Sequence, residues 1–152
     1  MKIFKIFALA AMMFGMVACD DEYGDGTLVD PELKSKYNGT VSVMSGSSPY
    51  NTENIEVEVI PCSNDAVDIA FYKIKFVPQM PVKINLRVPN VPITRADNGV
   101  INLAGNNIVP LFAGGPYEDR IVTNLVGTIT NTTIELSLNF GDTPTTYKGT
   151  KK

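Results

Sequence analysis

The sequence has no histidine and no tryptophan, and it has two cysteines among 152 residues. Without histidine the chain cannot build a Ser-His-Asp or Cys-His nucleophile system, nor a metal site with histidine ligands. The lack of tryptophan argues against a module that binds sugars by ring stacking. With 44% hydrophobic and 19% charged residues, the composition is that of a folded chain. The length fits one domain.

Long hydrophobic runs are also missing, with one exception near the N-terminus. Ile6 to Ala18 is a run of 13 apolar or small residues, preceded by Lys2 and Lys5. Such a run is too short to cross a bilayer as a helix and suits the core of a signal peptide. We therefore predict a signal peptide over residues 1–18.

The run ends in Met16-Val17-Ala18-Cys19, which resembles the lipobox of bacterial lipoproteins. The small side chains before Cys19 would let a peptidase reach that bond. The Cys19 sulfur would carry a diacylglyceryl thioether, and the freed amine would be acylated. Several acyl chains give stable anchoring, because each buried methylene contributes about 0.8 kcal/mol. The alternative is an ordinary secretory peptide that happens to end in cysteine.

Positive charge is scarce in the expected mature chain. Cleavage removes Lys2 and Lys5 and leaves 11 basic and 16 acidic side chains, a formal net charge of −5. A chain without a basic patch does not bind nucleic acid through its phosphates. Thioether formation at Cys19 would also leave Cys62 unpaired within the molecule, and a small buried side chain is the expectation there. The role of an unpaired Cys62 cannot be taken from the sequence.

A short acidic and glycine-rich segment follows the predicted lipidation site, from Cys19 to Gly26. Its composition is typical of a flexible linker. We assign residues 19–34 to a lipidated acidic tether and residues 35–152 to the folded domain. The acidic segment resembles the export signal of some surface lipoproteins, so the domain is expected at the cell surface or on the periplasmic face.

Beyond the tether, hydrophobic residues alternate with polar ones at a period of two, which predicts half-buried antiparallel strands. In one strand Val67, Ile69 and Phe71 share the inner face, and Tyr72, Ile74 and Phe76 then take it over. This change of phase predicts a β-bulge near Phe71-Tyr72. Turn residues such as Asp97-Asn98-Gly99 and Asn131-Thr132 separate the strands. Eight or nine strands with no amphipathic helix between them predict an all-β barrel or sandwich.

The two ends of the domain favour the barrel. Tyr37-Asn38-Gly39 opens the first strand, and Tyr147-Lys148-Gly149 lies in the last. Glycine inside a strand often marks a sharp bend or a close backbone approach at a barrel corner. Pairing of these two strands would leave no exposed edge.

Five motifs in this order resemble the calycin-like domain of lipoproteins from Gram-negative anaerobes. They are Tyr37-Asn38-Gly39, Ile74-Lys75-Phe76 with Met80-Pro81-Val82, Val91-Pro92-Ile93, Val126-Gly127-Thr128-Ile129 with Ile134-Glu135-Leu136-Ser137-Leu138, and Tyr147-Lys148-Gly149-Thr150-Lys151. The resemblance implies an antiparallel eight-stranded barrel, lipocalin-like in outline, on an outer-membrane lipoprotein. It carries over no catalytic residue.

Paired carboxylates occur in the sequence, but not in an arrangement that predicts catalysis. Glu56 and Glu58 alternate with apolar residues and should share the outer, wetted face, and Glu118-Asp119 falls in a loop. The residue inventory offers no nucleophile–base pair. We predict no enzyme, no cofactor and no metal site.

Two functions then compete. In the first, a hollow barrel holds a small apolar or amphipathic ligand. The predicted lumen residues are Val43, Val57, Phe71, Ile84, Leu86, Leu103, Ile134 and Leu136. In the second, the barrel is filled and residues 110–120 bind an envelope partner in a surface complex. The residues singled out for that role are Leu111, Phe112 and Tyr117. Ligand, partner and oligomeric state stay open.

Overall fold

The computed structural model describes residues 33–63, 65–76 and 82–152. The described residues are almost entirely β-structure and include a short 3-10 helix. The elements are β1 (Ser35–Ser45), β2 (Ser48–Ser63), β3 (Ala66–Ile74), β4 (Ile84–Arg95), β5 (Ile101–Gly105), β6 (Leu111–Phe112), β7 (Gly115–Pro116), η2 (Glu118–Arg120), β8 (Val122–Ile129), β9 (Thr133–Phe140) and β10 (Thr143–Lys151).

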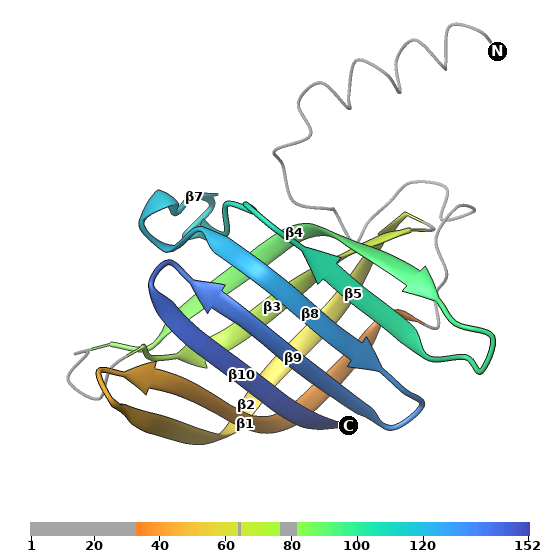
Figure 1. Ribbon diagram of the computed structural model, residues 1–152, viewed down its shortest axis with the longest axis horizontal. Coiled ribbons are helices and arrows are strands. Elements are labelled where there is room, and N and C mark those ends of the chain that lie inside the picture. Colours follow the sequence, from red (N-terminus) through yellow and green to blue (C-terminus); the bar gives the residue numbers. More distant parts are fainter. Residues whose placement is uncertain (1–32, 64, 77–81) are drawn as a thin grey trace, which may run out of the picture.

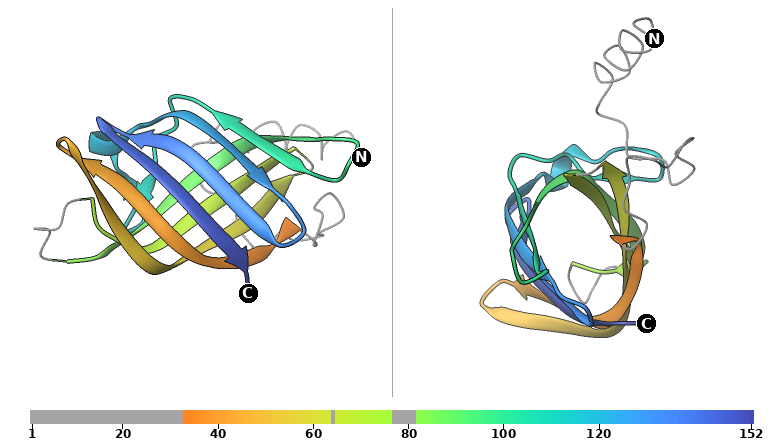
Figure 2. Two further views of the ribbon diagram at one scale, coloured as in Figure 1. Left: turned by 60° about the horizontal axis from the view of Figure 1, so that its bottom comes forward. Right: turned by 90° about the vertical axis from the view of Figure 1, so that its right-hand side faces the viewer.

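Eight of the strands form a closed antiparallel barrel (Figures 1 and 2). Each strand pairs with the next along the chain, in the order β1, β2, β3, β4, β5, β8, β9 and β10, and β10 returns to β1. The right-hand view of Figure 2 shows the barrel end-on. β6 and β7 form a small hairpin attached to the side of β4. The predicted barrel is confirmed, and the sandwich alternative is excluded.

The closing seam is the pairing of β1 with β10 that the two glycine motifs predicted. Gly39 lies directly opposite Gly149 across this seam. A Cβ atom on Gly39 would lie 1.9 Å from the carbonyl oxygen of Lys148, and one on Gly149 would lie 2.6 Å from the Tyr147 hydroxyl. The two backbones therefore approach more closely than any side chain allows. Tyr147 uses this space to cross the interior, where its hydroxyl donates to the Ile55 carbonyl at 2.8 Å.

The interior is a packed core. Its inward side chains form one hydrophobic cluster, each at most 9% exposed. Within this cluster the Phe71 ring meets the Phe140 ring edge-on at 5.5 Å, and Phe140 meets Phe76 at 5.2 Å. Such edge-to-face contacts stabilise beyond simple burial. Side chains therefore fill this barrel, as the second of the two competing interpretations requires.

Five register shifts mark β-bulges in the described wall, and four of them contain one non-glycine residue with positive φ: Asn54, Lys73, Asn90 and Asn124. Asparagine tolerates this conformation better than most residues. A bulge leaves a backbone N–H without a ladder partner. Neighbouring side chains accept three of these donors: Asn85 binds the N–H of Lys73, Asp68 that of Asn90, and Asn106 that of Asn124.

The predicted bulge in the third strand is confirmed, with a small shift. The register of β3 against β4 changes between Phe71 and Ile74, where Lys73 has φ of 61°. Tyr72 was expected to join Ile74 on the inner face, and this is wrong: its hydroxyl donates to Glu58 on the outer side of the wall. Both Tyr72 and Lys73 face outward before the alternation resumes.

The barrel has two different ends, and the antiparallel order decides which turns meet at each. The tether end holds the start of β1 at Ser35, the β4–β5 turn, the β8–β9 turn and the end of β10 at Lys151. The hairpin end holds the β1–β2 turn, the β9–β10 turn and the β6–β7 hairpin with η2. The β4–β5 turn at Asp97-Asn98-Gly99 and the β8–β9 turn at Asn131-Thr132 lie where predicted.

The predicted signal peptide, Cys19, most of the acidic tether and the Pro78–Pro81 loop lie outside the described residues. Within residues 33–63, 65–76 and 82–152, no helix is both long and apolar enough to cross a membrane.

Candidate functional site

The connection from β5 to β8 builds the most elaborate surface of the molecule. β5 ends at Gly105 after five residues, so it covers β4 only from Ile93 to Arg95. Farther along β4, beyond the reach of β5, β6 pairs with β4 instead, through Arg87 and Leu111. An isolated bridge between Ile108 and Val122 ties the same segment to β8. Residues 106–121 thus complete the wall between β4 and β8.

A pocket of about 340 Å³ lies between this insertion and β4. Its apolar lining comes from Pro89, Ile108, Val109, Leu111 and Pro116. Three polar side chains, Asn90, Asn107 and Glu118, interrupt that lining. Predominantly apolar walls with a few placed polar groups, in a volume of roughly 300–1,000 Å³, are typical of ligand and peptide pockets.

Unfavourable backbone conformations gather around this pocket. Asn90 and Asn107 have φ of 53° and 55°, and Ala113 at the hairpin tip has φ of 55°. A left-handed alanine is costly, because its side chain gives no local hydrogen bond in compensation. The Pro110 carbonyl accepts from the Tyr117 N–H at 2.8 Å and holds the hairpin closed. The surface is therefore fixed in shape before any partner arrives.

Two aromatic rings of the insertion stack at its surface. Phe112 and Tyr117 have ring centroids 5.4 Å apart, and Phe112 is 39% exposed although it is a large hydrophobic residue. Tyr117 packs partly against the core cluster. Phe112 is thus held against the body of the protein by a neighbouring ring and still faces solvent.

Beside the insertion, Arg120 of η2 helps to close the hairpin end of the barrel. Its guanidinium carbon lies 4.5 Å from the centroid of the Phe76 ring. The same guanidinium donates to the Thr143 hydroxyl at 2.7 Å. Phe76 packs in turn against Phe140 of the core. Arg120 therefore lies across the aromatic core as a cover and is held by a cation–π contact and a hydrogen bond.

A second pocket, of about 440 Å³, opens at the tether end. Leu33, Ile101 and Ile129 form its buried floor, and Arg95 and Lys151 belong to its exposed rim. Burial in this region raises the pKa of the Tyr37 hydroxyl above its ordinary value, and a hydrogen bond with Ser35 partly offsets the increase. The lining is more polar than that of the hairpin-end pocket.

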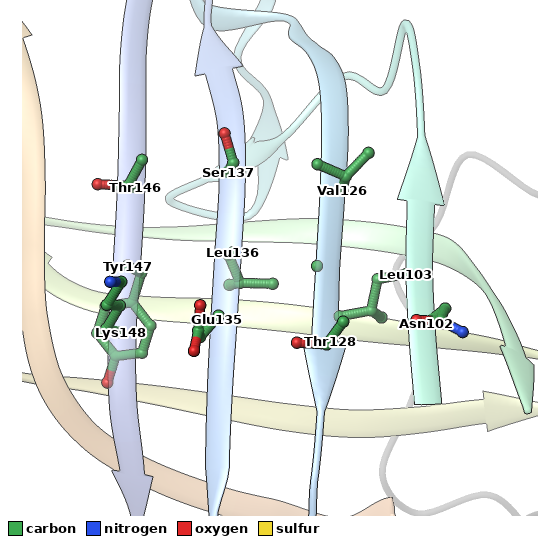
Figure 3. Close-up of a pocket in the computed structure, with 11 residues that line it drawn as sticks. Asn102, Leu103, Val126, Thr128, Glu135, Leu136, Ser137, Thr146, Tyr147 and Lys148 are labelled. Carbon is green, nitrogen blue, oxygen red and sulfur yellow. The ribbon is translucent and has the colours of Figure 1, made fainter. Parts of the chain in front are cut away.

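A third hollow, of about 510 Å³, is shallow and lies on the outer wall over β5, β8, β9 and β10 (Figure 3). Gly127 stands opposite Leu103 and Leu136, and a Cβ atom there would lie 2.6 Å from the Leu136 side chain. Around the hollow, Glu135 faces Lys148 across the strands. These are solvated ladder positions, so we give the hollow no functional role.

A buried polar cluster on the outer side of β2, β3 and β4 was not predicted. Asp68 is 0% exposed, although the inward and outward pattern suggested no buried charge. Arg87 donates through Nε to one Asp68 oxygen at 2.7 Å, and the Asn90 N–H donates to the other at 2.9 Å. The only sequence signal was an acid between β-branched residues in a strand. Its structural reason is the bulge at Asn90, which needs an acceptor.

Glu58 also differs from its expected position. It lies on the outer side as predicted, but it is buried rather than wetted, and it accepts from the Tyr72 hydroxyl at 2.8 Å. Burial, together with this hydrogen bond to a carboxylate, raises the pKa of Tyr72 to about 12. Glu56, by contrast, is ion-paired with Lys152 at 2.9 Å near the surface. The two carboxylates therefore have separate partners.

Cys62 is buried as expected, at 5% exposed, but the expectation that it is unpaired was wrong. Cys62 is disulfide-bonded, and no described cysteine is free. The second cysteine of the chain, Cys19, lies outside the described residues. One sulfur cannot be both a thioether and part of a disulfide, so lipidation of Cys19 requires Cys62 to take another state. As a thiol, Cys62 would donate to Asp68 Oδ1, which lies 2.9 Å from its sulfur.

The structure brings both predicted residue sets together. All eight predicted lumen residues are buried side chains of the core cluster; they are Val43, Val57, Phe71, Ile84, Leu86, Leu103, Ile134 and Leu136. Leu111, Phe112 and Tyr117 lie together in the β6–β7 hairpin and its flank. Among the described residues, no group of three histidine, cysteine, aspartate or glutamate side chains is arranged to hold a metal ion.

No protein-family model and no curated protein matches the sequence. Among solved structures, the chain is similar to one from Bacteroides fragilis described as "a putative outer membrane protein", with a TM-score of 0.59 and 20% identity. The match covers 79% of this chain and 51% of the other, so this chain spans about half the length of its structural neighbour. At this level of identity the likeness shows the fold alone.

The polarity of the wall is opposite to that of barrels that cross membranes. Those barrels carry an apolar band on the outside and polar residues within. Here Glu56, Glu135 and Lys148 lie on the outer face of the strands, and the apolar side chains are inside. The outer faces of β9 and β10 therefore carry solvent-facing charges, whereas the outer sides of β2 and β3 hold the buried Glu58 and Asp68 side chains.

Proposed function

We propose that this chain is a lipid-anchored binding module of the cell envelope that holds an envelope protein at the hairpin end of its barrel. The binding surface, here called the hairpin surface, comprises the 340 Å³ pocket and the adjoining residues Phe112 and Tyr117. The order of the sequence motifs and the eight-stranded topology agree with a calycin-like family. The function itself rests on the site.

One observation carries the proposal: exposed apolar surface and fixed polar groups occur together at the hairpin end, while the barrel interior is occupied by its own side chains. The described lumen residues are at most 8% exposed, whereas Phe112 is 39% exposed. Aromatic residues that anchor an interface are typically large, rigid and surrounded by polar groups. The hairpin surface has these features.

The chemistry of the pocket indicates what it would hold. Its apolar lining accommodates one branched or aromatic side chain, and Glu118 supplies an acceptor for a backbone or side-chain donor beside it. The Asn90 and Asn107 amides offer both a donor and an acceptor. An exposed loop of another protein presents this combination of an apolar side chain and flanking peptide groups.

A photo-reactive amino acid at Pro116, an exposed position in the hairpin surface, tests the proposal in cells that make the full-length chain. We expect a single cross-linked species of defined mass, lost when Phe112→Asp is introduced. Val126→Asp is the matched control, because Val126 is an exposed apolar residue on the outer wall. Persistence of the species in Phe112→Asp, or its loss in the control, would overturn the proposal.

The competing proposal, a small apolar ligand inside the barrel, has less support because the inner side chains already fill the space. It predicts saturable uptake of a hydrophobic fluorescent probe that Leu86→Trp blocks. We expect no saturable uptake by the delipidated protein, and uptake sensitive to Leu86→Trp would return the function to the interior.

The lipid anchor is tested separately by metabolic labelling with a fatty acid. We expect label in the wild-type chain and none in Cys19→Ser, together with a Cys62 that reacts with a thiol reagent after denaturation. An unlabelled chain with no reactive thiol would indicate that Cys19 is held in a disulfide, and the anchor would then be rejected.

A further inference from the structure

The hairpin surface contains a carboxylate that no cation of the described chain neutralises. Glu118 is exposed, and among the described residues that line the pocket it is the one charged side chain. No described cation forms an ion pair with it. The two nearest arginines along the chain have other contacts: Arg87 is ion-paired with Asp68 at 2.7 Å, and Arg120 lies over the aromatic core.

Two further carboxylates lie beside Glu118. Asp119 follows it in η2, and Asp142 lies in the β9–β10 turn; both are exposed. This turn packs on η2, because the Gly141 N–H donates to the Ile121 carbonyl at 2.9 Å. A Cβ atom on Gly141 would lie 3.0 Å from the Asp119 carbonyl oxygen. Three carboxylates therefore face the Arg120 guanidinium alone, and the surface next to the pocket is negative.

The lysines at this end of the barrel are too distant to cancel that charge. Lys83 precedes Pro89 of the pocket by six positions, which is roughly 20 Å of extended strand. Lys75 follows Ile74, which pairs with Ile84, so it is similarly far from the pocket along the strands. Charges at the surface act over only about 8 Å at physiological salt.

The same surface also presents the face of aromatic rings. Phe112 and Tyr117 have centroids 5.4 Å apart, Phe112 is 39% exposed, and Tyr117 directly precedes Glu118 in the sequence. Aromatic faces attract cations. The protein shows this chemistry nearby, where the Arg120 guanidinium carbon lies 4.5 Å from the centroid of the Phe76 ring. An exposed ring and an unpaired carboxylate therefore belong to one small surface.

We propose that the hairpin surface recognises a partner loop that carries an arginine next to the apolar side chain held in the pocket. This inference rests on the proposed function and names the chemistry of its partner. A planar guanidinium stacks on an aromatic ring and donates two hydrogen bonds to one carboxylate, which a lysine ammonium does not do. The methylene stem of arginine covers apolar surface at the pocket mouth.

The test uses the mature-length chain with Cys19→Ser and two blocked tetrapeptides, Gly-Leu-Arg-Gly and Gly-Leu-Gln-Gly, titrated by NMR of the backbone amides. We expect the arginine peptide to bind about tenfold more tightly, since an exposed ion pair and a cation–π contact each contribute modestly. Glu118→Gln should reduce this preference to about twofold. The matched control, Glu135→Gln, removes an exposed carboxylate of the outer wall and should leave the preference unchanged.

Phe112→Ala separates this inference from the proposed function, because it removes the ring without adding charge and should weaken both peptides. Equal affinity for the two peptides, each weakened by Phe112→Ala, would overturn the arginine preference and leave the proposed function intact. A preference that Glu135→Gln reduces as much as Glu118→Gln would also overturn it, because general charge would then be the cause. If neither peptide shifts the amides of the hairpin surface, the inference is rejected, and cross-linking at Pro116 decides the proposed function on its own.

Discussion

The two ends of the barrel differ in how they are closed. At the hairpin end, three aromatic rings and the Arg120 guanidinium cover the core, and residues 106–121 add a hairpin with a pocket. At the tether end, short turns of two to five residues leave an open pocket with a polar rim. The wall between them is continuous and the same strands reach both ends. The difference therefore comes from the connections.

This comparison shows where the chain places its costly features. Three of the six non-glycine residues with positive φ, Asn90, Asn107 and Ala113, lie in β4 and the insertion, and the buried Asp68 carboxylate pairs with Arg87 of β4. The tether end carries exposed charges on short turns, which cost little and tolerate substitution.

The largest expected difference in stability comes from two glycine-to-alanine substitutions, one toward each end of the barrel, which each add one methyl group. Gly39→Ala would force a Cβ atom against the Lys148 carbonyl in the tether-side half of the seam. Because this contact is with backbone, we expect a loss of about 4 kcal/mol or more in unfolding free energy. Gly115→Ala at the hairpin end meets nothing within 4 Å and should change stability by under about 0.5 kcal/mol. Urea denaturation measures both, and similar midpoints would show that β1 and β10 do not meet closely.

The next prediction concerns packing at the two ends. Phe140→Ala removes a fully buried ring from the aromatic cover and should cost about 3–5 kcal/mol. Ile101→Ala, beside the open pocket, should cost less, about 2 kcal/mol, because that side chain already borders a space. Thermal unfolding of both variants gives the order. A larger cost for Ile101→Ala would mean that the tether end is the better packed one.

Alkaline pH tests the buried hydroxyls. Burial raises the pKa of Tyr147, and burial with the Glu58 hydrogen bond raises that of Tyr72 to about 12. Tyrosines in the unfolded chain ionise near pH 10. Stability from these groups is therefore present below pH 10 and is lost as pH rises from 10 through the folded-state values. We expect Tyr72→Phe and Tyr147→Phe each to reduce the steepness of that loss. Unchanged curves of unfolding free energy against pH would contradict the burial of both hydroxyls.

The smallest effect distinguishes two arginines. Arg120→Ala at the hairpin end removes the contact with Phe76 and the hydrogen bond to Thr143, which should cost about 1–2 kcal/mol. Arg95→Ala at the tether end removes an exposed side chain and should cost about 0.5 kcal/mol or less. Chemical denaturation resolves the pair, and equal losses would show that Arg120 does not cover the core.

Much of the barrel wall was predictable, because successive side chains of a strand point to opposite faces. The alternation of apolar and polar residues therefore shows which side chains are buried. Ile134, Leu136 and Leu138 were expected to face inward, and they do. The closing seam was also predictable, since glycine within an aromatic-rich strand signals a close backbone approach. The exact positions of the bulges were less predictable. Tyr72 was assigned to the inner face, but a tyrosine ring can lie on either side of the wall.

The polar cluster was not predictable, since its cause is long-range. Asp68 is buried because an N–H at Asn90, 22 positions away, requires an acceptor once the bulge forms. In the same way, Leu111 was recognised as part of a candidate surface, but no local signal placed it against Pro89 and Asn90. Glu58 was expected in water because alternation assigns a side chain to a face without showing what covers that face.

The sequence by itself determined that this protein is an antiparallel barrel, since alternation sets the burial of each strand and paired glycines permit the seam. It also determined the composition of the insertion and the tether, which are local properties of the chain. Only the tertiary structure decided that side chains fill the interior, that one end is covered and the other open, and that carboxylates of η2 and of the β9–β10 turn lie beside one pocket. These features depend on which turns lie together at each end of the barrel. Closure of the barrel sets that arrangement.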